Sequence, residues 1–184
     1  MDPLISLTIA VAIAVLCGAS AVHQLLRWGE WPGIVGNYDL TPESMTPVIA
    51  AAIPLLEAQC AIALLWPRTR AMGAMGAAGL LTLFAFAIWF NIHRGRSHID
   101  CGCFGARLRT GLSRGMVWRN VLLSALALSL LLPVTARALS LLEVAVSLVS
   151  VATFALLYPV LSLLLQYGPG WQSGRAPAFS REAR

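Results

Sequence analysis

The stretch AMGAMGAAGLLTLFAFAIWFNI, residues 71–92, decides the fold class because it carries no charged side chain. A helix rises about 1.5 Å per residue, and about 20 apolar residues cross the roughly 30 Å hydrocarbon layer of a membrane. The stretch therefore predicts a transmembrane helix. Within it, Gly73, Gly76 and Gly79 recur at helical spacing, and we expect them to let a neighbouring helix approach closely.

Similar apolar stretches lie on both sides. We predict five spans, with four as the alternative, at about residues 3–26, 47–66, 71–92, 117–132 and 138–167. Tryptophan and tyrosine residues near the span ends fit the headgroup level of a bilayer. The fifth span is long, about 45 Å as a helix, so we expect it to tilt, to bend near Pro159 or to pass beyond the membrane. The prediction is an all-α polytopic membrane bundle in one domain, residues 1–167, with a flexible polar tail at 168–184.

The composition excludes several classes of protein. Hydrophobic residues make up 58% of the 184 residues and charged ones 11%, and the mean hydropathy is +0.76. A soluble domain has about 45–50% apolar and about 25% charged residues, so an ordinary soluble enzyme, a disordered chain and a nucleic-acid-binding domain are excluded. The net charge is +5, and the arginines sit in short gaps between apolar runs. We interpret them as topology signals and contacts to membrane lipids, not to nucleic acid.

A cysteine pair follows the third span. Cys101 and Cys103 are separated by Gly102, and arginines at 94, 96, 107 and 109 flank them. A glycine lets the chain bend enough to close so small a ring, and a strained disulfide is readily exchanged. Arginine charge favours the reactive thiolate. The pattern predicts a dithiol–disulfide centre at the membrane surface. Two alternatives stay open, namely free structural cysteines or a soft-metal site completed by His93 and His98.

Ionisable residues inside spans are costly and usually have a purpose. Glu57 lies midway along the second span with Cys60 on the same helix face, and Glu143 lies near the start of the fifth. Each could relay protons or hold a quinone, or could make a hydrogen bond between helices. For Glu143 we expect the hydrogen bond, and for Glu57 the two readings are balanced. No motif for haem, flavin or nucleotide is present, and a quinone has no other support, so we expect no cofactor.

The two remaining cysteines are not expected to pair. Measured from the face of the N-terminus, Cys17 lies about 20 Å deep and Cys60 about 9 Å deep. This difference of about 10 Å exceeds what a disulfide tolerates. We expect both to be small buried apolar residues.

The distribution of arginine conflicts with an oxidising location for the pair. With five spans, the face that carries Cys101 and Cys103 holds ten arginines and the opposite face three. The positive-inside rule would place the ten in the cytoplasm, whereas protein disulfides persist in the periplasm.

The string Cys101-Gly102-Cys103-Phe104-Gly105, its place after the third span, and Pro54-Leu55-Leu56-Glu57 in the second span resemble the MauE family of methylamine-utilisation proteins. That family is grouped with small DoxX/DoxD-like redox-associated membrane proteins. The resemblance covers about residues 4–133. It implies a DoxX-like four-helix core plus a fifth span, in a bacterial inner membrane.

The resemblance also implies a role in maturation, processing or export of the β (light) subunit of methylamine dehydrogenase. Cys101 and Cys103 would exchange electrons with the thioredoxin-like protein MauD, which favours periplasmic exposure. We expect no stand-alone enzyme beyond thiol–disulfide oxidoreductase activity. Two alternatives stay open: a thiol-independent chaperone or docking scaffold that uses residues 28–46, and a small transporter supported by Glu57.

Overall fold

A computed structural model describes residues 1–96, 112–135, 137 and 140–167, and in these ranges its regular elements are helices, with no strand. Side chains of the last helix are described as far as Thr153 and again at Leu157. The predicted all-α fold class is confirmed. Cys101, Cys103 and the tail at 168–184 lie outside the described residues.

Each predicted span overlaps a helix. The helices are α1 (Pro3–Leu26), α2 (Trp31–Asn37), α3 (Thr46–Leu65), α4 (Arg70–His93), α5 (Arg114–Ser129) and α6 (Leu141–Tyr167), and a 3-10 turn, η1 (Glu43–Met45), precedes α3. Within the described part of the chain, α1, α4 and the stretch Glu43–Leu65 are long and apolar enough to cross a membrane. These three helices make the chain a membrane protein.

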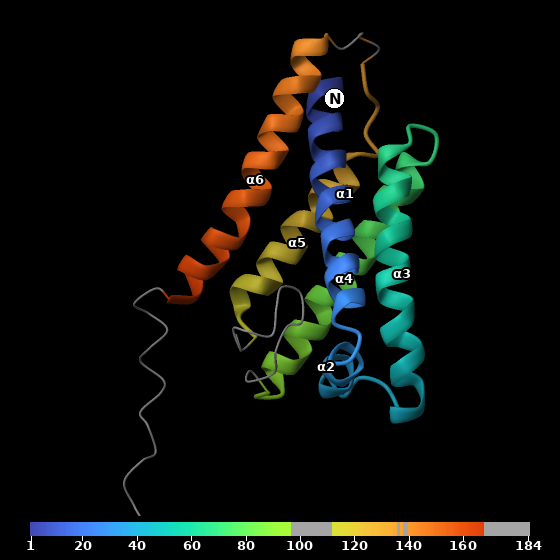
Figure 1. Cartoon of the computed structure of the whole chain (residues 1–184), viewed down its shortest axis with the longest axis vertical. Coiled ribbons are helices and arrows are strands. Elements are labelled where there is room, and N and C mark those ends of the chain that lie inside the picture. The colour runs from blue at the N-terminus through green and yellow to red at the C-terminus, as the bar shows by residue number, and fades with distance from the viewer. Residues whose placement is uncertain (97–111, 136, 138–139, 168–184) are drawn as a thin grey trace, which may run out of the picture.

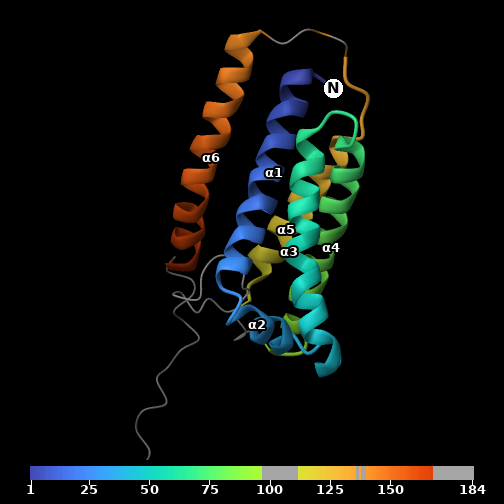
Figure 2. The same cartoon turned by 45° about the vertical axis from the view of Figure 1, so that its right-hand side comes forward.

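Four helices form the core of the bundle. In Figures 1 and 2, α1, α3, α4 and α5 run side by side, and each is antiparallel to the core helix before it. The short helix α2 lies between α1 and α3 in the chain and is not part of this core. Helix α6 lies outside this core and packs on α1, where the Thr8 hydroxyl donates to Ser147 Oγ at 3.1 Å. Large apolar side chains face outward along the bundle, as lipid contact requires.

The two ends of the bundle differ. One end, here called the N-terminal end, carries the start of α1 and the links from α3 to α4 and from α5 to α6 (Figure 1). The other carries α2, the end of α4 and the start of α5. We call it the cysteine end because the segment that contains Cys101 and Cys103 joins α4 to α5. The unpredicted helix α2 covers this end, and its buried Trp31 donates from Nε1 to the Ala50 carbonyl at 2.8 Å.

Helices α3 and α4 cross closely through glycine. A Cβ on Gly73 would lie 2.7 Å from the Leu64 backbone nitrogen, and one on Gly76 would lie 2.7 Å from Cys60 Sγ. Nothing lies within 4 Å of a Cβ built on Gly79. The predicted close approach is therefore confirmed at Gly73 and Gly76 and is wrong for Gly79.

Candidate functional site

The cysteine end holds the chain immediately before the predicted redox pair by ion pairs. Arg96 Nη1 lies 2.8 Å from Asp39 Oδ2, and Arg94 Nη2 lies 3.9 Å from the same oxygen. Asp39 has a φ of +50°, a conformation that asparagine and aspartate tolerate better than most residues. The carboxylate of Asp39 therefore partly neutralises the positive charge of these two arginines. The sequence analysis did not identify Asp39.

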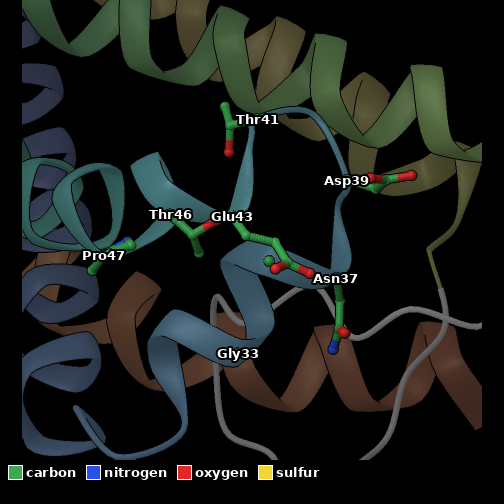
Figure 3. Close-up of a pocket in the computed structure, with 8 residues that line it drawn as sticks. Gly33, Asn37, Asp39, Thr41, Glu43, Thr46 and Pro47 are labelled. Atoms are coloured by element: carbon green, nitrogen blue, oxygen red, sulfur yellow. The ribbon is translucent and has the colours of Figure 1, made fainter.

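A polar hollow of about 440 Å³ adjoins this ion-pair cluster. It is lined by side chains or backbone of Gly33, Gly36, Asn37, Asp39, Thr41, Glu43, Thr46 and Pro47. Figure 3 shows Asp39 at its edge, toward α4. All of the lining residues except Pro47 belong to residues 28–46, the segment that the docking alternative predicts as a contact surface.

Of the four residues in the alternative soft-metal site, the structure describes only His93. The His93 ring stacks on Trp89 with centroids 5.6 Å apart and planes 10° apart. Among the described residues no group of three or more His, Cys, Asp or Glu side chains could hold a metal ion. His98 and the two cysteines lie outside this range.

Glu57 is the centre of a buried polar cluster between α1 and α3. Its side chain is 4% exposed. The Ser20 hydroxyl donates to Glu57 Oε1 at 3.0 Å, and Gln24 Nε2 donates to Glu57 Oε2 at 2.9 Å and to Ser20 Oγ at 2.9 Å. Ser20 and Gln24 are one turn apart on α1, so both face Glu57. The hydrogen bond between helices, one of the two balanced readings for Glu57, is present. The two donors fix the orientation of the carboxyl group.

The predicted difference in depth between Cys17 and Cys60 is wrong. Gly18 of α1 lies level with Ala61 of α3, since a Cβ on Gly18 would lie 3.8 Å from that of Ala61. At about 1.5 Å per residue, Cys17 and Cys60 then differ in level by only about 3 Å. The sequence estimate assumed that the two helices end at one plane, whereas α1 extends well beyond the end of α3 (Figure 1).

Both thiols are free and buried and belong to the main apolar cluster of the bundle. Cys60 Sγ fills the space beside Gly76. The expectation that these cysteines are small buried residues agrees with their surroundings.

The expectation for Glu143 is wrong. Its carboxylate pairs with Arg137 and accepts a hydrogen bond from the Ser140 backbone N–H at 2.8 Å, while its own N–H donates to Ser140 Oγ at 3.2 Å. This reciprocal arrangement is a capping box at the start of α6. Glu143 therefore begins a helix at the N-terminal end and makes no hydrogen bond between spans.

These features define a class: a multi-helix membrane protein with a short Cys-Gly-Cys string in the chain between two of its helices and a buried carboxyl group within the bundle. The sequence matches the family described as "Methylamine utilisation protein MauE" over residues 2–133. The chain belongs to this family.

Two curated relatives extend the match beyond the family region. The chain is 36% identical over 170 residues to the methylamine utilization protein MauE of Methylophilus methylotrophus, covering 90% of this chain and 88% of the relative. It is 37% identical over 166 residues to that of Paracoccus denitrificans, covering 89% of each. No solved structure matches the chain. Methylamine utilisation is therefore the process in which the family takes part.

Proposed function

We propose that this protein serves methylamine utilisation as a redox-active maturation factor for the β subunit of methylamine dehydrogenase. In this proposal Cys101 and Cys103 exchange electrons with a thioredoxin-like partner, the MauD protein. Family membership carries the proposal. It is supported by the Cys-Gly-Cys string and by the ion pairs of Arg94 and Arg96 that hold the chain just before it.

The proposed exchange balances without an outside reagent. When the pair is reduced, the thiolate of one cysteine attacks the disulfide of the partner, forms a mixed disulfide and releases one partner thiolate, which takes up a proton. The second cysteine of the pair then attacks the mixed disulfide. Two electrons and two protons pass to the partner, and the pair becomes a disulfide. The same steps in reverse reduce the pair.

We place the cysteine end on the periplasmic side of the bacterial inner membrane, because exchangeable disulfides persist in that compartment. The test uses intact cells and a membrane-impermeant maleimide, with and without prior reduction. Labelling of Cys101 and Cys103 from outside only after reduction supports a periplasmic disulfide. Labelling only after lysis places the pair in the cytoplasm and contradicts the proposal.

The chemistry is tested with single variants. Cys101→Ser and Cys103→Ser should each abolish maturation of the β subunit, and the variant that keeps the attacking thiol should trap a mixed disulfide with the thioredoxin-like partner under non-reducing conditions. Cys17→Ala is the matched control, because its thiol is buried in the bundle and should not matter. Normal maturation with both serine variants would refute the exchange mechanism.

A docking scaffold that works without thiols is the second candidate. The polar hollow at residues 33–47 favours it, because its rim residue Asp39 is joined to Arg96, five residues before Cys101. This candidate predicts that both serine variants mature the client, whereas Asn37→Trp or Thr41→Trp, which would fill the hollow, block partner binding. The two sets of variants therefore separate the candidates.

A further inference from the structure

The interior of the bundle differs on the two sides of Glu57. From the level of Glu57 toward the N-terminal end it is packed with a cluster of buried apolar side chains. The cluster consists of Ala10, Ile13, Ala14, Cys17, Cys60, Ala61, Leu64, Ala74, Ala77, Ala78, Ala127 and Leu130. The residues are mostly alanine, so the helices lie close and little space remains between them. This half of the interior separates Glu57 from the N-terminal end.

Toward the cysteine end the buried side chains include amides and hydroxyls, which lie among apolar residues such as Leu81, Ala85 and Ile88. Gln24, at the level of Glu57, is 2% exposed. Ser124 of α5 is buried, and its hydroxyl is hydrogen-bonded at 2.9 Å to that of Thr82 on α4, an exposed residue. One turn beyond Ser124, about 6 Å along α5, lies Asn120, which is 3% exposed. Nine residues beyond Thr82, about 14 Å along α4, lies Asn91, which is completely buried.

Three of these amide side chains have a buried atom without a hydrogen-bond partner. The atoms are Gln24 Oε1, Asn120 Nδ2 and Asn91 Oδ1. In each residue the other polar atom of the amide is hydrogen-bonded. Gln24 Nε2 donates to Glu57, Asn91 Nδ2 donates to the Ala87 carbonyl, and Asn120 Oδ1 accepts from Arg119. Buried polar atoms in folded proteins are nearly always paired, and internal water commonly supplies the partner.

We propose that water binds these three amides in the half of the bundle toward the cysteine end and that Glu57 exchanges its proton with that end alone. Gln24 and Asn120 hold the waters nearest the carboxyl group, and Asn91 holds those near the surface. The small apolar cluster of Ile88 and Leu112 lies between the levels of Asn120 and Asn91, so the water file is narrowest there.

The titratable groups around Glu57 fit this assignment. The thiols of Cys17 on α1 and Cys60 on its own helix are close enough to interact with it electrostatically, and both lie on the apolar side. The buried side chains that α4 and α5 place near its level are Ala78, Leu81 and Ser124, and none of them titrates. Water at the cysteine end is thus the proton source and sink for Glu57, and this inference does not depend on the exchange chemistry proposed above.

The experiment is infrared spectroscopy of the purified full-length protein in lipid vesicles. The protonated-carboxyl band of Glu57 is identified as the one missing in Glu57→Gln. On transfer from H₂O to D₂O this band should shift within minutes in the wild type. Asn120→Leu, which removes a water ligand and fills its space, should slow the shift at least tenfold, and Asn120→Ser should restore part of the rate.

The matched control lies on the apolar side. Ser6 is 1% exposed near the start of α1, and its hydroxyl is also without a partner, but the apolar cluster separates it from Glu57. Ser6→Ala should leave the rate unchanged. If Asn120→Leu fails to fold, Asn91→Leu provides the same test near the surface.

Three results would overturn the inference. The first is a wild-type Glu57 band that resists exchange for hours, which means a dry carboxyl group. The second is an equal effect of Asn120→Leu and Ser6→Ala. The third is the absence of any Glu57-dependent protonated band at every pH at which the protein stays folded.

Discussion

The glycines of α4 allow a graded test of the helix crossing. A Cβ at Gly73 would meet the Leu64 nitrogen at 2.7 Å and the Ala63 carbonyl carbon at 2.9 Å. These are backbone atoms, which cannot rotate away, so the helices must separate. Overpacking costs about 1–3 kcal/mol, and we expect Gly73→Ala to lower the free energy of unfolding by about 3 kcal/mol, the upper end of that range.

The other two glycines should behave differently. At Gly76 the obstructing atom is Cys60 Sγ, the end of a side chain that can turn, so Gly76→Ala should cost about 1 kcal/mol. Adding Cys60→Ala should return at least half of that loss, because it removes the obstructing sulfur. At Gly79 the space is open, and Gly79→Ala should stabilise the helix by up to about 1 kcal/mol.

The assay is reversible unfolding of the purified protein in mixed micelles with increasing dodecyl sulfate, followed by circular dichroism. A double-mutant cycle isolates the coupling between residues 76 and 60. Equal losses at all three glycines, or a Cys60→Ala change that does not compensate Gly76→Ala, would show that the crossing is not set by these contacts.

Three further predictions use the same unfolding assay. Glu57→Ala leaves the buried donor of Gln24 without its acceptor and should cost about 1–3 kcal/mol; Glu57→Gln should cost less, because it keeps one acceptor oxygen. Asp39→Asn removes two partly exposed ion pairs and should cost about 1 kcal/mol or less, a loss that should shrink as salt is added. Ser147→Ala removes the acceptor of Thr8, should cost about 0.6 kcal/mol, and should make α6 more sensitive to protease. A cost at Ser147 without increased cleavage would contradict the packing of α6 on α1.

The positions of α1, α3 and α4 could be predicted from the sequence because lipid imposes length and apolarity on each helix separately. The helices α1, α3 and α4 begin and end within a residue of the predicted bounds. Helix α2 was missed because a seven-residue helix with two glycines and a proline has little local signal. Its stability comes from packing, above all from the buried indole of Trp31.

The site was predicted in part. Glu57 stood out because a carboxyl group within a span is rare. Its donors Ser20 and Gln24 could not be identified from the sequence, because their alignment with Glu57 depends on how far α1 and α3 are shifted along one another. That shift is set by packing between helices, and no residue pattern within one helix reports it. The wrong depth for Cys60 has the same cause.

The location of Ser20 and Gln24 on the first helix affects the biosynthesis of the protein. The ribosome makes α1 before α3, so both donors are in the membrane when Glu57 arrives. The carboxyl group, which would be costly alone in lipid, never has to wait for a partner encoded further along the chain. Helices α1 and α3 can therefore pair during translation. When α4 is made, its Gly73 and Gly76 can pack directly against the α3 helix of this pair.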